Sequence, residues 1–418
     1  MSLKIIKYLV KLELIFGCIS IFLVPINKHL VTIVMLFWLL SSILNFIIDK
    51  IENKSKITFS KKHIPLFLIP LFYLIHIFGL IYTSNFEYGL FDLEVKLSMF
   101  LIPFILWLRF NVYKEKQVIL LQSLVFGSLS SFFINVTLAG IHYHSHPDVD
   151  FFFYTFLSPI HPSYMALYVS LSLLSLLCIG SKPIFFNVNK SLLLGILSFT
   201  ILLIYLFLLS SKAGIIIFII TLIIYMAIQF SHKIKVKYIV LIASLIITFF
   251  GLIIHFTPSI QNRFQPMMNA LIHSNEANLD SKESSMERIA IYVTSTKLAY
   301  HKLPWGVGTG DTKDEIIENY KKLGSKTINE RYLNAHNQYL QTTITLGILG
   351  LTSLLLILAG GFRYAIKKRN VLFFSFLILI SLNMFFESML EQQAGVIFIT
   401  LFFTLFCIWE KPKLNNQE

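Results

Sequence analysis

Residues 334–340 read Asn-Ala-His-Asn-Gln-Tyr-Leu and run into an apolar stretch at 342–351, Thr-Thr-Ile-Thr-Leu-Gly-Ile-Leu-Gly-Leu. This junction joins a long polar segment to a predicted membrane helix, so His336 lies where water meets the bilayer. An ionisable side chain at such a position often has a function, because the membrane interior penalises charge. A histidine that is merely solvated at the interface fits the position equally well, and the rest of the chain has to decide between the two interpretations.

Composition sets the class of protein. Hydrophobic residues make up 56% of the chain and charged residues 14%, and the mean hydropathy is +0.73. These values lie far outside the range of soluble domains. They predict an all-α, polytopic integral membrane protein.

The net charge of +13 does not indicate nucleic-acid binding. The lysines are spread over short loops between apolar runs and form no basic stripe with interleaved aromatic residues. Cys18, Cys178 and Cys407 each lie inside an apolar run, so neither a disulfide framework nor a metal site is predicted. We expect no cofactor.

Apolar runs of membrane-spanning length recur along the chain. The first follows a basic segment, ends at Val24 and lacks a small-x-small cleavage motif, so we interpret it as an uncleaved span. The others are placed at 29–48, 64–82, 97–110, 118–141, 163–179, 192–210, 213–229, 238–256, 338–361, 371–386 and 394–409. Together they predict about twelve spans.

Lysine and arginine alternate from loop to loop, which predicts the topology because short cytoplasmic loops retain positive charge. The loops at 83–95 and 142–162 contain neither residue, and the first carries acidic side chains instead. Both chain ends are therefore predicted to be cytoplasmic. The positive loops carry Lys50, Lys54, Lys56, Lys61 and Lys62; Arg109, Lys114 and Lys116; Lys182 and Lys190; Lys233, Lys235 and Lys237; and Arg363, Lys367, Lys368 and Arg369.

One long polar insertion, about 257–336, interrupts the spans and is predicted to lie outside the cell membrane. It divides the chain into 1–256 with nine spans, a loop domain on the outer side at 257–336, and 337–418 with three spans and a cytoplasmic tail. The insertion contains a helical pattern at 283–301. Loops of this length inside a compact architecture are usually functional.

Residues 304–311 read Pro-Trp-Gly-Val-Gly-Thr-Gly-Asp. The glycines suggest a phosphate cradle, but a Gly-Lys-Ser/Thr sequence and a strand-turn-helix context are both missing. A turn that positions the adjoining helices is the better interpretation.

Several polar residues are predicted to share the outer face. Lys212 lies in a tight hairpin, Arg288 lies on the helical stretch of the insertion, and His161 precedes a span. The last two spans are joined by Glu-Ser-Met-Leu-Glu-Gln-Gln at 387–393, which includes Glu391. A snorkelling lysine, an exposed arginine or a helix cap would explain each one singly. Together they bring cations, a histidine and carboxylates to one side of the membrane.

These residues carry a resemblance to the O-antigen ligase family. The resemblance rests on the arginine of the long loop, on the Pro-Trp-Gly-Val-Gly-Thr-Gly turn, and on Ala-His-Asn-Gln-Tyr-Leu at 335–340 with Gly347 and Gly350 behind it. Span count and loop placement extend it over nearly the whole chain, while the specific motifs are confined to about 210–214 and 286–351. Members transfer a polysaccharide from an undecaprenyl diphosphate carrier to the lipid A core at the periplasmic face, without a nucleotide sugar or a required metal. The resemblance therefore implies a bacterial inner-membrane location.

The family's site residues are carried over one by one. His336 matches the histidine of the His-Asn motif, and Arg288 matches the arginine of the long loop. Lys212 stands where the family usually has arginine after serine. Lysine keeps the charge but lacks the planar fork that binds phosphate in a bidentate manner. Asn337, His161 and Glu391 are candidate accessory residues, and neither Asn337 nor Tyr332 is singled out as a group that orients the acceptor.

The chemistry explains these residue types. Cations in a partly desolvated site would stabilise the charge that develops on the leaving diphosphate. A histidine would take the proton of the acceptor hydroxyl.

Three alternatives stay open. O-antigen polymerases share the architecture, and some members of the family glycosylate proteins. A transporter of lipid-linked glycans would also need many spans, but transporters place charged groups near the membrane midplane and often have repeated halves. The predicted spans are almost uncharged at their centres, and the long loop has no counterpart in the first half, which favours the enzyme.

Overall fold

The computed structural model describes residues 3–52, 64–146, 156, 158–179, 188–230, 236–256, 284–322 and 334–409, with a few single positions between 261 and 272. Regular secondary structure in these ranges is entirely helical, which confirms the all-α prediction. The helices are α1 (Leu3–Leu23), α2 (Lys28–Ile51), α3 (Ile64–Gly79) with the short turn η2 (Leu80–Tyr82), α4 (Phe86–Lys96), α5 (Ser98–Leu108), α6 (Phe110–Tyr113), α7 (Gln117–Ser145), α8 (Pro162–Ile179), α9 (Val188–Leu208), α10 (Lys212–Phe230), α11 (Val236–Phe256), α13 (Ser284–His301), α14 (Thr312–Lys322), α15 (Gln338–Lys368), α16 (Val371–Phe386) and α17 (Gln393–Ile408).

The described residues include six helices that are long and apolar enough to cross a membrane. They are α2, α3 with η2, α7, α8, α10 and α15, and the shorter apolar stretches of α9, α16 and α17 accompany them. Each predicted span overlaps a helix of the structure. The protein is therefore a multi-pass membrane protein, and the total of about twelve spans stays a prediction.

The connection predicted at 83–95 contains a helix that its sequence did not indicate, α4. Asn85 begins the helix by accepting a hydrogen bond from the backbone N–H of Tyr88 at 3.1 Å. Asp92, Leu93 and Lys96 are buried, at the spacing of one helical face. The acidic residues lower the hydropathy of the segment, so a search for apolar runs could not find this helix.

The core of the bundle is built around α8 and α17. Both are buried on nearly every side, as expected for helices that are apolar all round. Aromatic rings fill the space between them and α16: the ring centroids of Tyr168 and Phe398 are 4.5 Å apart, and those of Phe376 and Phe406 are 5.4 Å apart with the rings tilted. This packing holds α8, α16 and α17 against one another.

The glycine-rich stretch at 304–311 is a turn, as predicted. It follows α13 in the chain and packs between α3 and α15. The backbone N–H groups of Val307 and Gly308 donate to the carbonyls of Ile344 and Thr345 at 2.9 Å each, and Thr309 donates to Gly79 of α3. Gly347 adopts φ +60 inside α15, where a Cβ would lie 1.9 Å from the carbonyl oxygen of Pro304. Only glycine fits this left-handed position, so the turn is inserted at a break in α15.

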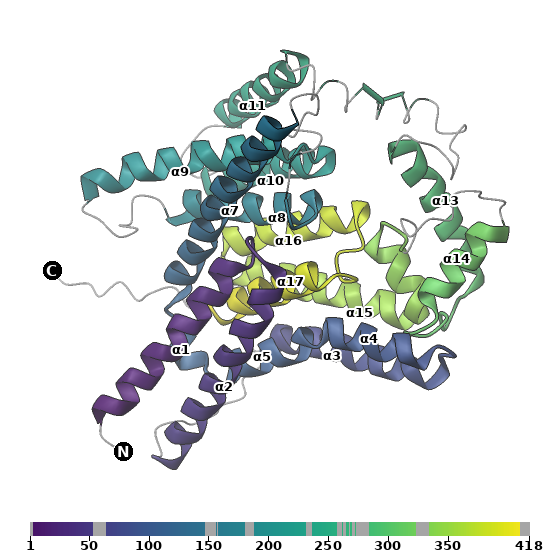
Figure 1. The fold of residues 1–418 in the computed structure, drawn as a ribbon, viewed down its shortest axis with the longest axis horizontal. Helices are drawn as coiled ribbons and strands as arrows, with labels where there is room; N and C mark the ends of the chain where they lie inside the picture. Colours follow the sequence, from purple (N-terminus) through teal and green to yellow (C-terminus); the bar gives the residue numbers. More distant parts are fainter. Residues whose placement is uncertain are drawn as a thin grey trace.

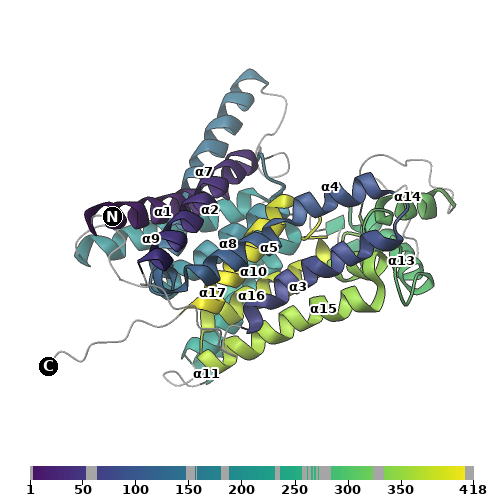
Figure 2. The ribbon, with the colours of Figure 1, turned by 90° about the horizontal axis from the view of Figure 1, so that it is seen from below.

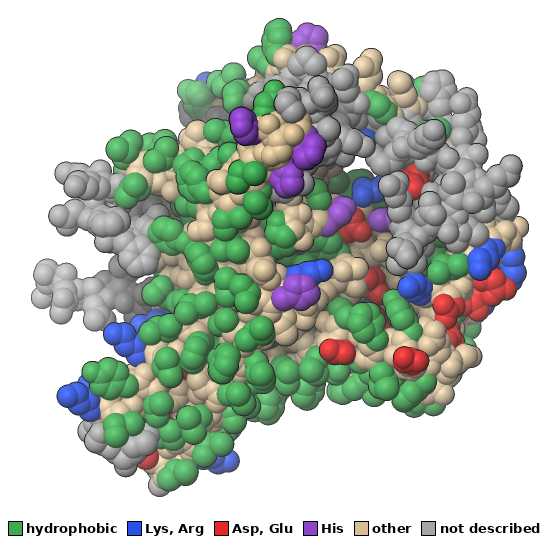
Figure 3. All heavy atoms as spheres, viewed as in Figure 1, with side chains coloured by type: hydrophobic (Ala, Val, Ile, Leu, Met, Phe, Trp, Pro, Cys, Tyr) green, Lys and Arg blue, Asp and Glu red, His purple; other side chains and the backbone are tan. Residues whose placement is uncertain are grey.

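α15 is kinked at Gly347, and the part after the kink, 348–368, spans about 32 Å at 1.5 Å per residue, which is enough to cross a hydrocarbon core about 30 Å thick. In both ribbon views α13 and α14 lie at one end of the molecule, and the start of α1 lies toward the opposite end (Figures 1 and 2). Charged side chains gather over the α13 and α14 end, while hydrophobic side chains dominate much of the rest of that face (Figure 3).

The loop charges lead to a prediction about topology. Alkaline phosphatase fused after Ser274 is expected to be active, because the insertion is predicted to be periplasmic, and fusions after Ser55 and Lys368 are expected to be inactive. Ser274 and Ser55 lie outside the described residues. Cytoplasmic reporters at the same positions should give the complementary pattern. The reverse result would rule out both the topology and the site proposed below.

Candidate active site

His336 lies just before α15 in a constrained backbone conformation. Its φ of +46 is in the left-handed region, which is uncommon for residues other than glycine and costs free energy. The neighbouring residues hold it there. Asn334 Oδ1 accepts a hydrogen bond from the His336 backbone N–H at 2.8 Å, and Gln341 Oε1 accepts one from Ala335 at 2.9 Å. Asn337 caps α15 by accepting a hydrogen bond from the N–H of Leu340. In the His-Asn pair, the asparagine therefore begins the helix, and the histidine directly before it is held in one conformation.

Glu387 connects His336 to Arg288. The carboxylate lies in the connection between α16 and α17, residues 387–392, and is 6% exposed. Glu387 Oε1 is 3.2 Å from His336 Nδ1, and Glu387 Oε2 is 3.6 Å from Arg288 Nη2. Three distant parts of the chain therefore meet at one carboxylate: the long insertion, the start of α15 and the end of α16.

Glu387 determines which ring nitrogen of His336 carries the hydrogen. Burial raises the pKa of this carboxyl, but the hydrogen bond from His336 and the positive charge of Arg288 bring the pKa below its usual value. An ionised Glu387 accepts the hydrogen of Nδ1, so in the neutral tautomer of His336 the lone pair lies on Nε2. The His336 side chain is 22% exposed.

Tyr292 ties the same elements together. It lies one helical turn after Arg288 on α13, and its hydroxyl donates to the carbonyl of Phe385 at 2.9 Å, with the carbonyl of His336 at 3.3 Å. Burial raises the pKa of Tyr292 to about 12, so the hydroxyl stays a donor at neutral pH. α13 is thereby fixed against the ends of α15 and α16, and Arg288 is held near Glu387.

The connection at 387–392 is itself held from two sides. The backbone N–H of Leu390 donates to Gln338 Oε1 at 2.6 Å, and the hydroxyl of Tyr164 on α8 donates to the carbonyl of Ser388 at 3.4 Å. Gly395 packs against this connection so closely that a Cβ would lie 1.9 Å from the carbonyl of Met389. Glu387 is thus positioned by buried contacts of the whole connection.

His161 belongs to the same group of charges. It directly precedes α8, where its Nδ1 accepts a hydrogen bond from the Ser163 N–H at 3.4 Å. Burial lowers the pKa of His161, with Glu387 opposing this effect and Arg288 adding to it, so the ring is neutral at pH 7. Because Nδ1 accepts, Nε2 carries the hydrogen and is a neutral donor beside the site.

Lys212 is the first residue of α10. Ser211 accepts a hydrogen bond from the N–H of Gly214 at 3.2 Å, and Gly214 leaves just enough room for Ala166 of α8. The first turn of α10 therefore packs against the first turns of α8, at the end where His161 lies. That Lys212 and Arg288 share one ligand stays a prediction.

Glu391 lies in a second cluster of charges. Its carboxylate is 3.4 Å from the buried Nζ of Lys96, which also contacts Asp92 on the same helix. The structure gives it no contact with His336. Tyr332 lies outside the described residues.

Glu387 is the site residue that its sequence context does not predict. The available signal was weak: a carboxylate in an outer connection between the last two spans. Only the fold shows which of the two carboxylates of that connection meets His336. In the recessed region beside α13, histidine, acidic and basic side chains lie next to one another (Figure 3). Among the described residues, no group of histidine, cysteine and acidic side chains is arranged to hold a metal ion.

Comparison with known proteins finds a family similarity over part of the chain. No curated protein matches the chain. Residues 197–355 match the sequence model of the O-antigen ligase family, a range that includes Lys212, Arg288 and His336. The chain therefore carries an O-antigen ligase domain, the domain that O-antigen ligases and polymerases share.

Proposed function

We propose that the protein is an O-antigen ligase, which transfers a glycan from an undecaprenyl diphosphate carrier to a hydroxyl of the lipid A core at the periplasmic face of the bacterial inner membrane. The observation that carries the proposal is the contact of one buried carboxylate, Glu387, with both His336 and Arg288. It joins a proton acceptor to a cation, which are the two groups that this transfer requires.

In the proposed reaction the acceptor hydroxyl attacks the anomeric carbon of the carrier-linked sugar. A carbon–oxygen bond forms to the acceptor, and the bond between that carbon and the diphosphate oxygen breaks. His336 Nε2 takes the hydroxyl proton, and ionised Glu387 stabilises the imidazolium that results. The electron pair of the broken bond leaves with the diphosphate.

Arg288 and Lys212 stabilise the charge that develops on the leaving diphosphate. Arg288 is 31% exposed at its side chain, so it can face a ligand while it stays paired with Glu387. Lys212 is partly exposed at the start of α10. Neutral His161 adds a hydrogen-bond donor that brings no further charge.

A deletion strain tests the function. Deletion of the gene in its source bacterium is expected to leave lipopolysaccharide that consists of core without any repeat, because no glycan reaches the acceptor. Core that bears one repeat would instead assign the protein as an O-antigen polymerase, which the same domain allows. Complementation with the wild-type chain should restore the ladder on the gel. An unchanged ladder in the deletion strain would contradict both functions.

A further inference from the structure

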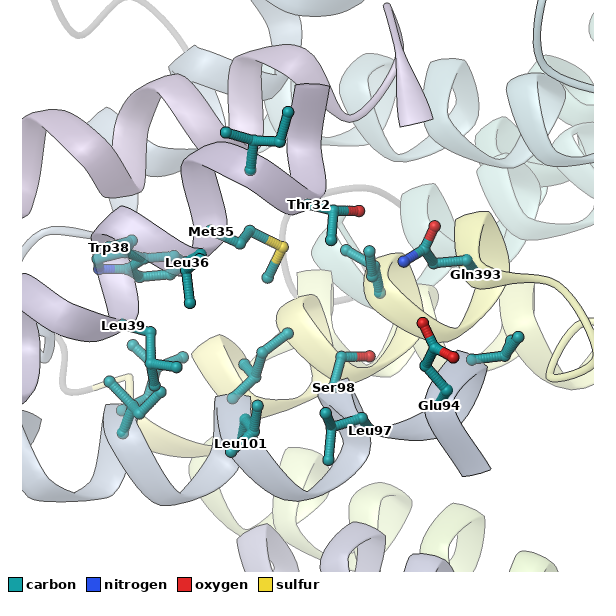
Figure 4. Close-up of a pocket in the computed structure, with 16 residues that line it drawn as sticks. Thr32, Met35, Leu36, Trp38, Leu39, Glu94, Leu97, Ser98, Leu101 and Gln393 are labelled. Carbon is teal, nitrogen blue, oxygen red and sulfur yellow. The ribbon is translucent and has the colours of Figure 1, made fainter. Parts of the chain in front are cut away.

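A pocket of about 360 Å³ lies between α2, the α4–α5 segment and the start of α17 (Figure 4). Apolar side chains form most of its wall, among them Met35 and Leu101, and Trp38 lies at one end. Four polar side chains gather at the other end: Thr32, Glu94, Ser98 and Gln393. We name it the α2–α5 pocket. An apolar chamber with one polar end fits a molecule that has a hydrocarbon chain and a polar head.

A cation borders the polar end of this pocket. Lys28 lies one helical turn before Thr32 on α2, so their side chains share one face of the helix. A small adjoining pocket is lined by Lys28, Tyr168 and Gln393, and it shares Gln393 with the larger one. Lys28 is exposed, so it can contact an anionic group of a ligand at the polar end of the pocket.

The polar end is also close in the chain to the candidate active site. Gln393 directly follows the connection at 387–392, whose Glu387 contacts His336. Glu391 of the same connection contacts Lys96, two residues after Glu94. The pocket and the histidine therefore adjoin one short, tightly held segment.

We propose that the α2–α5 pocket holds an acyl chain of the acceptor, a phosphate-bearing glycolipid, with its phosphate at Lys28 and its sugar hydroxyls toward Glu94 and Gln393. This rests on the proposed function, in which Arg288 and Lys212 bind the diphosphate of the donor. A second lipid substrate then needs its own chain site and its own cation, and it must bring a hydroxyl to His336. Sugar hydroxyls can donate to the Glu94 carboxylate, whereas a diphosphate at that position would be repelled by it.

Photolabelling of the full-length protein in lipid nanodiscs tests the proposal. The probe is a phosphorylated glucosamine disaccharide whose acyl chain carries a diazirine. After irradiation, labels are expected on peptides that contain Met35 and Leu101, because these side chains line the pocket. Unlabelled glycolipid should compete, and undecaprenyl diphosphate or phosphatidylglycerol at the same concentration should not.

Two variants and one control sharpen the test. Met35→Trp, which fills the pocket, is expected to remove most of the labelling. Lys28→Gln should weaken probe binding about tenfold, the value of one charge-assisted hydrogen bond. Leu40→Trp is the matched control on α2, since Leu40 is 54% exposed and does not line the pocket; its labelling should equal that of the wild type.

Each other outcome has a definite meaning. Competition by undecaprenyl diphosphate would mean that the pocket binds the chain of the donor. Equal competition by phosphatidylglycerol would mean that it binds ordinary membrane lipid. Either result overturns the proposal. Loss of labelling in Leu40→Trp as well would also overturn it. Specific labelling of a wild-type protein that transfers no glycan would leave the pocket intact and refute the proposed function. Normal transfer by a wild-type protein without pocket labelling would refute the pocket alone.

Discussion

Replacement of His336 by alanine is expected to slow glycan transfer by about a hundred- to ten-thousand-fold, the usual cost of losing a general base, while donor binding is retained. The expectation follows from the geometry at Glu387, whose ionised carboxylate holds Nδ1 of His336 at 3.2 Å and leaves Nε2 free to take a proton. The measurement is single-turnover transfer with purified protein and lipid-linked donor, alongside donor binding by the same preparation.

The pH dependence should follow the same residue. Transfer by the wild-type protein is expected to decline as the pH falls from neutral, because an imidazolium cannot accept the proton of the acceptor. Glu387 stays ionised over this range, since the hydrogen bond from His336 and the nearby cations lower the pKa of its carboxyl against the opposing effect of burial. A rate that is level across the mildly acidic range would argue against a base at this position.

A rival role for His336 makes a different prediction. If the ring only donated a hydrogen bond to the diphosphate, its loss would cost about 0.5–1.5 kcal/mol, which is a few-fold to about tenfold in rate. His336→Gln separates the two, because glutamine can still donate a hydrogen bond but is not a base. Full donor binding with transfer only a few-fold slower in His336→Gln would reject the general base.

The architecture could be predicted from sequence because membrane helices leave a strong and local signal. Each predicted span overlaps a helix, and α15 begins at Gln338, the first residue of the span predicted at 338–361. α13 was also expected, from its helical pattern. These features depend on residues that are neighbours in sequence, so the chain itself contains the information.

The charge pairs could not be predicted, because they depend on which distant segments meet. Glu387 and Glu391 are four residues apart in a similar sequence context, yet one contacts His336 and the other contacts Lys96. The break of α15 at Gly347 is likewise set by the turn that is inserted there. α4 could not be predicted from apolar periodicity, because its buried face includes the charged residues Asp92 and Lys96. These two side chains pair with each other and so tolerate burial.

The cations give the second large effect. Arg288→Ala and Lys212→Ala are each expected to lower transfer by about a hundred- to a thousand-fold, as removal of one preorganised charge-stabilising group does. Lys212→Arg should be tolerated, because the positive charge is kept and the guanidinium adds a fork that suits phosphate. Transfer and donor affinity are measured together in the purified system, at matched amounts of protein in the membrane. Lys297→Ala is the control, since Lys297 is an exposed cation on the same helix as Arg288.

The cations and the base should also differ in which step they affect. Arg288 and Lys212 would meet the diphosphate before and during the reaction, so their loss should weaken donor binding as well as turnover, whereas loss of His336 should affect turnover alone. Because Glu387 contacts both Arg288 and His336, Arg288→Ala combined with His336→Ala should cost less than the product of the two single effects. Near-normal transfer in Arg288→Ala or Lys212→Ala would refute the shared diphosphate site. Fully multiplicative losses in the double variant would show that Arg288 and His336 act independently, although both contact Glu387.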